Sequence, residues 1–149
     1  AGLYFEQFEI GQVIRHEIRR TVTDMDNRMF CSLTNNPAAI HIDHDYASKT
    51  EFGKPLMNSI FTLGLVMGLS IQDTTLGTTV GNLGMTETVF PKPVFAGDTI
   101  RAETRIVEKR ESKSRPTQGI LTFEHIGLNQ RDEIVCRTVR GALMMRKPA

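Results

Sequence analysis

A chiefly apolar run from Leu56 to Ile71 constrains the fold of this chain more than any other segment. Its 16 residues include few polar ones, among them Asn58, Ser59 and Thr62, and its apolar side chains point to every side of a helix. A helix that is hydrophobic all round must be enclosed by other elements. The run is also shorter than the ~20 apolar residues that a bilayer span needs. We therefore predict a buried helix that Asn58 or Ser59 caps at its start.

The segments after this helix have the pattern of β-strands. From Ile100 to Ile106, apolar and charged residues nearly alternate, which directs one set toward a core and the other toward solvent. Gly97, Asp98 and the polar residues 129–132 supply turns between such segments. Strands are expected near residues 78–90, 98–109, 117–128 and 133–146.

Shorter elements are predicted before the buried helix. We expect a first strand over residues 13–21, a helix over residues 24–34 and a helical turn near residues 45–50. The helix over residues 24–34 should be amphipathic, because three of its apolar residues fall at helical spacing: Met25, Met29 and Leu33.

The composition is that of one ordinary globular domain. Domains most often hold roughly 100–150 residues, so we expect a single domain over residues 1–149, with 40% hydrophobic and 23% charged residues. A net charge of +1 gives no reason to expect a nucleic-acid surface. Cys31 and Cys136 lack CxxC spacing, which favours free thiols in a reducing compartment over a disulfide or a zinc site. No signal peptide is visible, so we expect a cytoplasmic protein.

Long antiparallel strands that wrap around one apolar helix form an α+β domain. This order of elements resembles the hot-dog fold. One such sheet covers its helix on one face only, so we expect two copies to pair side by side as a homodimer, or to form a higher homo-oligomer.

A segment just before the apolar run carries the functional signal. It reads TNNPAAIHID over residues 34–43, with a histidine five residues after an amide. Further segments follow it: YA at 46–47, FG at 52–53, NS at 58–59 and FPKPVFAGDT at 90–99. In order and spacing they resemble the signature of the MaoC-like dehydratases, or (R)-specific enoyl-CoA hydratases. That signature reads S-G-D-x-N-P-x-H-x-D, then Y-A, F-G, a helix opening with H-G, and F-P-V-x-x-G-D-T. The resemblance covers essentially the whole chain.

The resemblance implies hydration of a trans-2-enoyl-CoA, or the reverse dehydration. The family uses an Asp and a His as its acid–base pair; His41 matches the His, but Asn36 stands at the Asp position. A neutral amide cannot accept a proton, although it can orient a water molecule. We therefore assign proton transfer to His41, since histidine is the side chain suited to it near neutral pH.

The missing carboxylate has possible replacements nearby in the sequence. Asp26 is the first choice, because the helix over residues 24–34 could bring it near the site. Three others are candidates as well: Asp24, Asp43 and Asp45. A further hypothesis is that Asn36 marks a subgroup that has lost the chemistry and only binds acyl groups.

The second requirement is a donor for the thioester oxygen. Free N–H groups at a helix start, aided by the helix dipole, stabilise such an oxyanion. The family places a glycine N–H there, and Ser59 occupies that position here, next to Asn58, which would help to bind the substrate. The alternative is that Asn58 and Ser59 only cap the helix.

Coenzyme A also needs cationic partners for its phosphates. The densest basic cluster is the candidate site for these phosphates, and it consists of Lys109, Arg110, Lys113 and Arg115. An equal alternative is that these residues only form a solvated loop. No resident cofactor is predicted, because neither GxGxxG nor a P-loop occurs. His41, Asp43 and His44 resemble a metal cluster, but the reaction needs no metal and we expect none.

The Asn-bearing signature looks closer to family members that act on short or branched dicarboxylyl-CoAs, such as mesaconyl- or itaconyl-CoA. Two other functions remain open from the sequence. A hot-dog thioesterase would use the same helix start but release a thiol, and an acyl-CoA binding module would show saturable binding without turnover.

Overall fold

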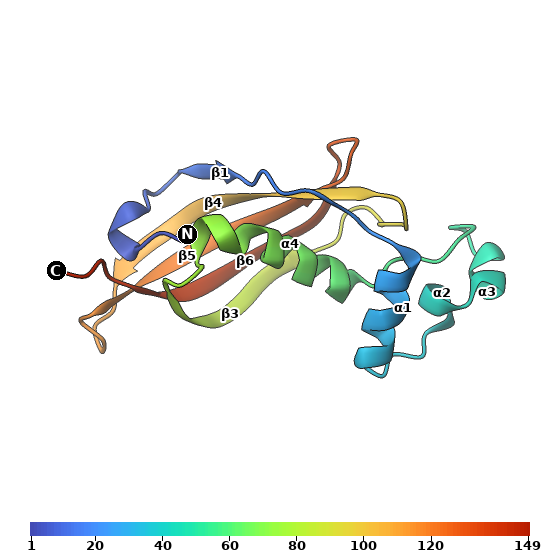
Figure 1. Ribbon diagram of the computed structural model, residues 1–149, viewed down its shortest axis with the longest axis horizontal. Helices are drawn as coiled ribbons and strands as arrows, with labels where there is room; N and C mark the ends of the chain where they lie inside the picture. The colour runs from blue at the N-terminus through green and yellow to red at the C-terminus, as the bar shows by residue number, and fades with distance from the viewer.

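The chain forms a six-stranded antiparallel sheet with one long helix lying across a face of it (Figure 1). The computed structural model describes residues 1–149. The sheet has the order β1-β4-β5-β6-β3, and β2 also pairs with β4. The strands are β1 (Val13–Arg15), β2 (Arg20–Thr21), β3 (Thr79–Val89), β4 (Thr99–Glu111), β5 (Gln118–Leu128) and β6 (Ile134–Met145). The helices are η1 (Phe5–Gln7), α1 (Asp24–Leu33), α2 (Ala39–Ile42), α3 (His44–Ser48) and α4 (Ser59–Thr74).

The four long strands confirm the predicted segments to within about two residues. In β4 the predicted alternation holds, since Ile100, Ala102 and Ile106 are buried on the side of the sheet that carries the core. The sheet and α4 approach one another closely at Gly127 of β5. A Cβ atom at this position would overlap the side chain of Val66 on α4, so the packing requires glycine here.

Helix α4 is covered on one side only. Its buried residues face the sheet and are Thr62, Val66, Leu69, Ser70 and Thr74. The opposite side carries Gly64 and Gly68, where an added Cβ would meet nothing within 4 Å, and Ile60, which is 56% exposed. A single chain therefore covers this helix on one side only, as expected for one such sheet, and does not enclose it on every side.

The segment before α4 differs from the expected elements in two ways. The predicted strand over residues 13–21 is split into β1 and β2, both against β4. The amphipathic helix over residues 24–34 is confirmed as α1, but Met25, Met29 and Leu33 are exposed. Its buried face instead carries Asn27 and Cys31, because Asn27 makes the hydrogen bonds that fix this helix to its neighbours.

The three helices α1–α3 lie together at one end of the sheet, next to the first turn of α4 (Figure 1). Helix α2 was not predicted, whereas α3 confirms the expected turn near residues 45–50. The hairpin that joins β4 to β5 lies at the opposite end of the sheet (Figure 1). No helix has the length and apolar character that crossing a membrane requires.

A buried chain of hydrogen bonds crosses the helix-facing side of the sheet. Arg140 Nε donates to His125 Nε2 at 2.9 Å, and His125 Nδ1 lies 2.8 Å from the Thr104 hydroxyl. That hydroxyl also bonds His16 Nε2 at 2.7 Å, and His16 Nδ1 pairs with Asp73 of α4 at 2.7 Å. Both histidines are buried. The chain of hydrogen bonds therefore ties the residue directly after β1 to the central strands and α4.

Candidate active site

His41 lies in α2, and its ring is held by one backbone hydrogen bond. Its Nδ1 is 2.7 Å from the carbonyl oxygen of Leu56. A carbonyl oxygen only accepts, so Nδ1 carries the hydrogen and donates it. In the neutral ring, Nε2 then has a free lone pair, and it has no hydrogen-bond partner in the chain. The ring is thus oriented with one nitrogen available as a proton acceptor.

His41 lines a cavity of about 310 Å³ between the helical end of the molecule and the start of α4. The cavity gathers most of the residues that the sequence marked for catalysis: its lining consists of Phe30, Thr34, Asn36, His41, Asn58, Ser59 and Ile60. His41 is the only histidine among these side chains, and no Asp or Glu is among them. The cavity therefore contains one base and no carboxylate.

Asn36 uses its amide oxygen locally. The side-chain Oδ1 of Asn36 accepts from the Ala38 N–H at 3.0 Å. The backbone N–H of Asn36 donates to the Cys31 carbonyl oxygen at 2.8 Å. Only an oxygen can accept from a backbone N–H, so the orientation of the amide is fixed. The Nδ2 group has no partner in the chain and remains a hydrogen-bond donor for a molecule in the cavity.

Asn27 organises the site, although it was not among the predicted site residues. It is 1% exposed and donates from Nδ2 to the carbonyl oxygens of His41 (2.9 Å) and Leu56 (3.0 Å). Its Oδ1 accepts from the Asn58 N–H at 2.9 Å. One side chain of α1 therefore holds α2, the segment before α4 and the cap of α4. The only signal in the sequence was a polar residue four positions before Cys31, on what proves to be the buried face of α1.

The start of α4 confirms Asn58 as its cap. Asn58 Oδ1 accepts from the Ile60 N–H at 2.9 Å, which leaves the Ser59 N–H without an acceptor in the chain. Ser59 belongs to the cavity lining, and the positive end of the helix dipole lies at the same place. The cap and the free donor thus coexist: Asn58 satisfies one orphan N–H and leaves another for a bound oxygen.

Asp26 is not brought to the cavity. Its carboxylate accepts from Arg20 at 2.6 Å and from the Thr23 N–H at 2.8 Å, as part of the capping box of α1. Desolvation by burial tends to raise the pKa of Asp26, but the hydrogen bonds from Arg20 and Thr23 outweigh it and lower that pKa below its ordinary value. A carboxylate of lowered pKa is a weaker base.

The other candidate carboxylates have partners elsewhere. Asp24 pairs with His44 and Arg28, Asp43 caps α3, and Asp45 pairs with Lys49. None of them lines the cavity. The rings of His41 and His44 also have different partners, the carbonyl oxygen of Leu56 and the carboxylate of Asp24, so they do not converge on one ion.

A second, smaller cavity adjoins the first at Ser59. Its volume is about 250 Å³ and its lining is mostly apolar: Phe52, Leu56, Met57, Ser59, Thr62, Phe90, Lys92, Pro93, Val94 and Val135. Ser59 lines both cavities. A molecule whose carbonyl oxygen binds the Ser59 N–H would therefore border His41 on one side and an apolar pocket on the other.

The basic cluster lies far from these cavities within one chain. Lys109 and Arg110 are part of β4 rather than of a loop, and Lys113 and Arg115 lie in the hairpin that follows. This hairpin is at the opposite end of the sheet from the start of α4 (Figure 1). Lys109 Nζ donates to the Phe8 carbonyl oxygen at 2.8 Å. The chain does not bring these four residues to its own candidate site.

Comparison with known proteins agrees with this geometry. Residues 5–128 match the family described as MaoC like domain. The chain is 30% identical over 147 residues to a protein named mesaconyl-CoA hydratase from Cereibacter sphaeroides. The aligned region covers 99% of this chain but only 42% of the relative. It thus spans less than half the length of that relative.

Solved structures share the same arrangement. A protein from Archaeoglobus fulgidus described as a monoamine oxidase regulatory protein superposes with a TM-score of 0.88 at 32% identity, covering 99% of this chain and 97% of the other. A Mycobacterium tuberculosis protein described as a double hot-dog fold superposes with a TM-score of 0.89 at 21% identity, covering 99% of this chain and 45% of the other. The α+β hot-dog fold expected from the sequence is therefore confirmed. Together with the match over residues 5–128, it shows that the chain belongs to the MaoC-like domain family.

Proposed function

We propose that this chain hydrates a trans-2-enoyl-CoA to a 3-hydroxyacyl-CoA, or catalyses the reverse dehydration. One observation carries the proposal: a single cavity is lined by a histidine with a free Nε2, an amide with a free Nδ2 and a helix start with a free N–H. Hydration of an enoyl thioester needs a base, a group that holds water and a donor for the developing oxyanion.

The addition gives each of these three groups a role. The Asn36 amide donates to the oxygen of a water molecule, and His41 Nε2 accepts one of the water's protons. The water oxygen bonds to Cβ, the electrons of the double bond move onto the thioester, and the Ser59 N–H stabilises the resulting enolate oxygen. The imidazolium of His41 then returns its proton to Cα. Because one base serves both steps from one side, hydroxyl and hydrogen add to the same face of the double bond.

The substrate we propose is a short, branched dicarboxylyl-CoA such as mesaconyl-CoA. This is the substrate named for the Cereibacter sphaeroides relative. The apolar cavity of about 250 Å³ beside Ser59 is smaller than the 300–1,000 Å³ typical of pockets that hold drug-sized ligands, which favours a short acyl group.

We also propose that two copies pair through β3 and the uncovered side of α4. Strand β3 lies at the edge of the sheet, and four of its apolar side chains are exposed: Val80, Leu83, Met85 and Val89. An exposed apolar edge strand favours pairing with another chain. The double hot-dog relative, about twice as long as this chain, supports a second unit of the same fold. A monomeric mass in solution at micromolar concentration would contradict this pairing.

Such pairing would give the basic cluster its function. If the two β3 strands run antiparallel, the second copy is reversed, and its β4–β5 hairpin lies at the same end as the first copy's candidate site. The cations of the partner's hairpin could then reach the phosphates of coenzyme A. The cluster consists of Lys109, Arg110, Lys113 and Arg115.

A panel of enoyl-CoAs that includes crotonyl- and mesaconyl-CoA tests the proposed reaction. Hydration removes the absorbance of the conjugated thioester without releasing a thiol, and this is the expected result. Thiol release detected with a thiol reagent would identify a thioesterase instead. Saturable binding without turnover of any member would identify a binding module.

A further inference from the structure

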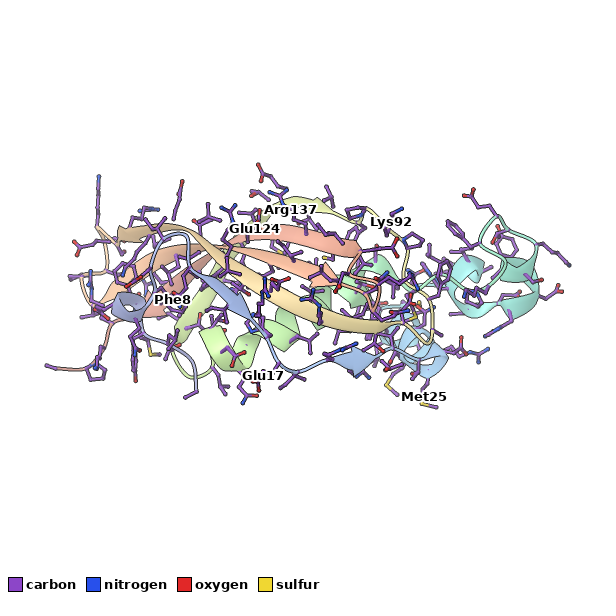
Figure 2. The ribbon with its side chains drawn as sticks, turned by 90° about the horizontal axis from the view of Figure 1, so that it is seen from above. Phe8, Glu17, Met25, Lys92, Glu124 and Arg137 are labelled. Carbon is purple, nitrogen blue, oxygen red and sulfur yellow. The ribbon has the colours of Figure 1, made fainter.

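The apolar cavity beside Ser59 contains one charged side chain. Of its 10 lining residues, Lys92 is the only one that carries a charge. Figure 2 shows Lys92 at the end of the sheet nearest to helices α1–α3, whereas Phe8 lies toward the opposite end. Lys92 thus lies on the side of the molecule that holds the candidate site.

The ammonium group of Lys92 has no close partner in the chain. It forms no salt bridge within 4.0 Å and no hydrogen bond, unlike Lys49, which pairs with Asp45 at 2.9 Å. The charge of Lys92 affects the pKa of one carboxyl group, that of Glu133. Hydrogen bonds from Asn129 and then Arg131 are the main causes of the lowered pKa of Glu133, and Lys92 contributes only at longer range. Lys92 is therefore free to pair with a bound anion.

We propose that Lys92 binds the distal carboxylate of a dicarboxylyl thioester and so selects such substrates over neutral enoyl-CoAs. This inference rests on the proposed function, since it assumes that the thioester oxygen binds the Ser59 N–H. The acyl group then extends from Ser59 into the cavity that Lys92 lines. A carboxylate in an apolar cavity needs a cationic or hydrogen-bonding partner, because its desolvation is otherwise costly.

A phosphate of coenzyme A is the competing anion, but the geometry disfavours it. The pantetheine arm separates the phosphates from the thioester, whereas Lys92 lines the same cavity as Ser59. A lysine that served the phosphates would be expected farther from the reacting carbonyl. The basic hairpin of a second copy offers such a location, as proposed above.

Two substrates that differ only at the distal group test the inference. Mesaconyl-CoA, with its thioester next to the methylated carbon, carries a carboxylate where 2-methylcrotonyl-CoA carries a methyl group. The variant Lys92→Met keeps an unbranched side chain but removes the charge. We expect kcat/KM for mesaconyl-CoA to fall about ten- to hundredfold, chiefly through KM, and kcat/KM for 2-methylcrotonyl-CoA to change less than about threefold. Lys92→Arg should retain part of the preference.

Lys54→Met is the matched control. Lys54 lies 4.6 Å from the centre of the Phe95 ring, close to the same region, but does not line the cavity. It should leave both kcat/KM values unchanged. Equal losses with both substrates after Lys92→Met would point to a phosphate contact and overturn the inference, as would no loss with either. If wild type hydrates no enoyl-CoA at all, the proposed function fails, which is a separate result.

Discussion

His41 and His125 belong to the same chain but have opposite surroundings. His41 lines a cavity, uses Nδ1 to bond the Leu56 carbonyl oxygen and leaves Nε2 free. His125 is 0% exposed, and both of its nitrogens are engaged, with Arg140 and with the Thr104 hydroxyl. The first ring can exchange a proton with a bound molecule. The second cannot gain one without losing a buried hydrogen bond.

The electrostatics of His125 follow from the same contacts. Desolvation by burial is the largest cause, and with the electrostatic interactions of Arg140 and His16 it lowers the pKa of His125 to about 3. Burial also lowers the pKa of Arg140 to about 10, so this guanidinium stays charged at neutral pH and remains a donor. The partners of an imidazole, and not its presence alone, thus decide between a catalytic and a structural role.

The largest expected effect is the loss of the free base. His41→Ala should lower kcat about a thousandfold, because general acid–base catalysis contributes roughly 10²–10⁴-fold and no other histidine and no carboxylate lines the cavity. Hydration kinetics measure this loss of kcat, and urea unfolding checks that the variant is still folded. His44→Ala is the matched control, since His44 is exposed and pairs with Asp24 outside the cavity. Retained turnover in His41→Ala would remove His41 from the mechanism.

The next largest effect is on the free energy of unfolding and concerns His125, whose ring nitrogens are both hydrogen-bonded. The pKa of His125 is lowered to about 3 in the folded protein from 6.5 in the unfolded chain, so the unfolded chain binds more protons between these values. This contribution to stability is complete above pH 6.5 and is lost as the pH falls toward 3, by about 1.4 kcal/mol per pH unit. Urea unfolding between pH 7 and about 5 measures it.

A free energy of unfolding that does not change with pH below 6.5 would contradict a buried, neutral His125 ring. A variant sharpens the test. His125→Gln keeps a side chain that can accept from Arg140 and should remove the slope, even if its stability at neutral pH is lower.

A smaller effect is expected at Asn27. Asn27→Leu should destabilise the protein by about 1–3 kcal/mol, because the Asn58 N–H loses its buried acceptor. It should also lower kcat, since the His41 and Leu56 carbonyl oxygens lose their shared donor. Unchanged stability and kcat in Asn27→Leu would show that α2 and α4 are positioned by other contacts.

The smallest expected effect is at Asn36. Asn36→Ala should lower kcat about tenfold, because one hydrogen bond to water contributes about 0.5–1.5 kcal/mol. Asn36→Asp keeps the bond from the Ala38 N–H and adds a possible proton acceptor, so its activity on crotonyl-CoA should at least equal that of wild type. A large loss in Asn36→Asp would instead show that the amide donor is required.

Local patterns predicted the elements well and their surroundings less well. The four strands follow from alternation, and the start of α4 follows from the capping residue Asn58, because both signals act over a few positions. The exposed side of α4 and the exposed Met25 and Met29 did not follow. Apolar residues indicate that one face of a helix favours burial, but they do not indicate which other element covers that face.

The sequence by itself determined the strands, the long apolar helix and its cap at Asn58, because short-range hydrogen bonding and periodicity encode them, and its resemblance to a known family singled out His41. Only the tertiary structure decided that Asn27 holds the site together, that Asp26 is engaged by Arg20, and that one cavity beside Ser59 contains Lys92. These facts depend on contacts between residues far apart in the chain, whose partners no local pattern can specify.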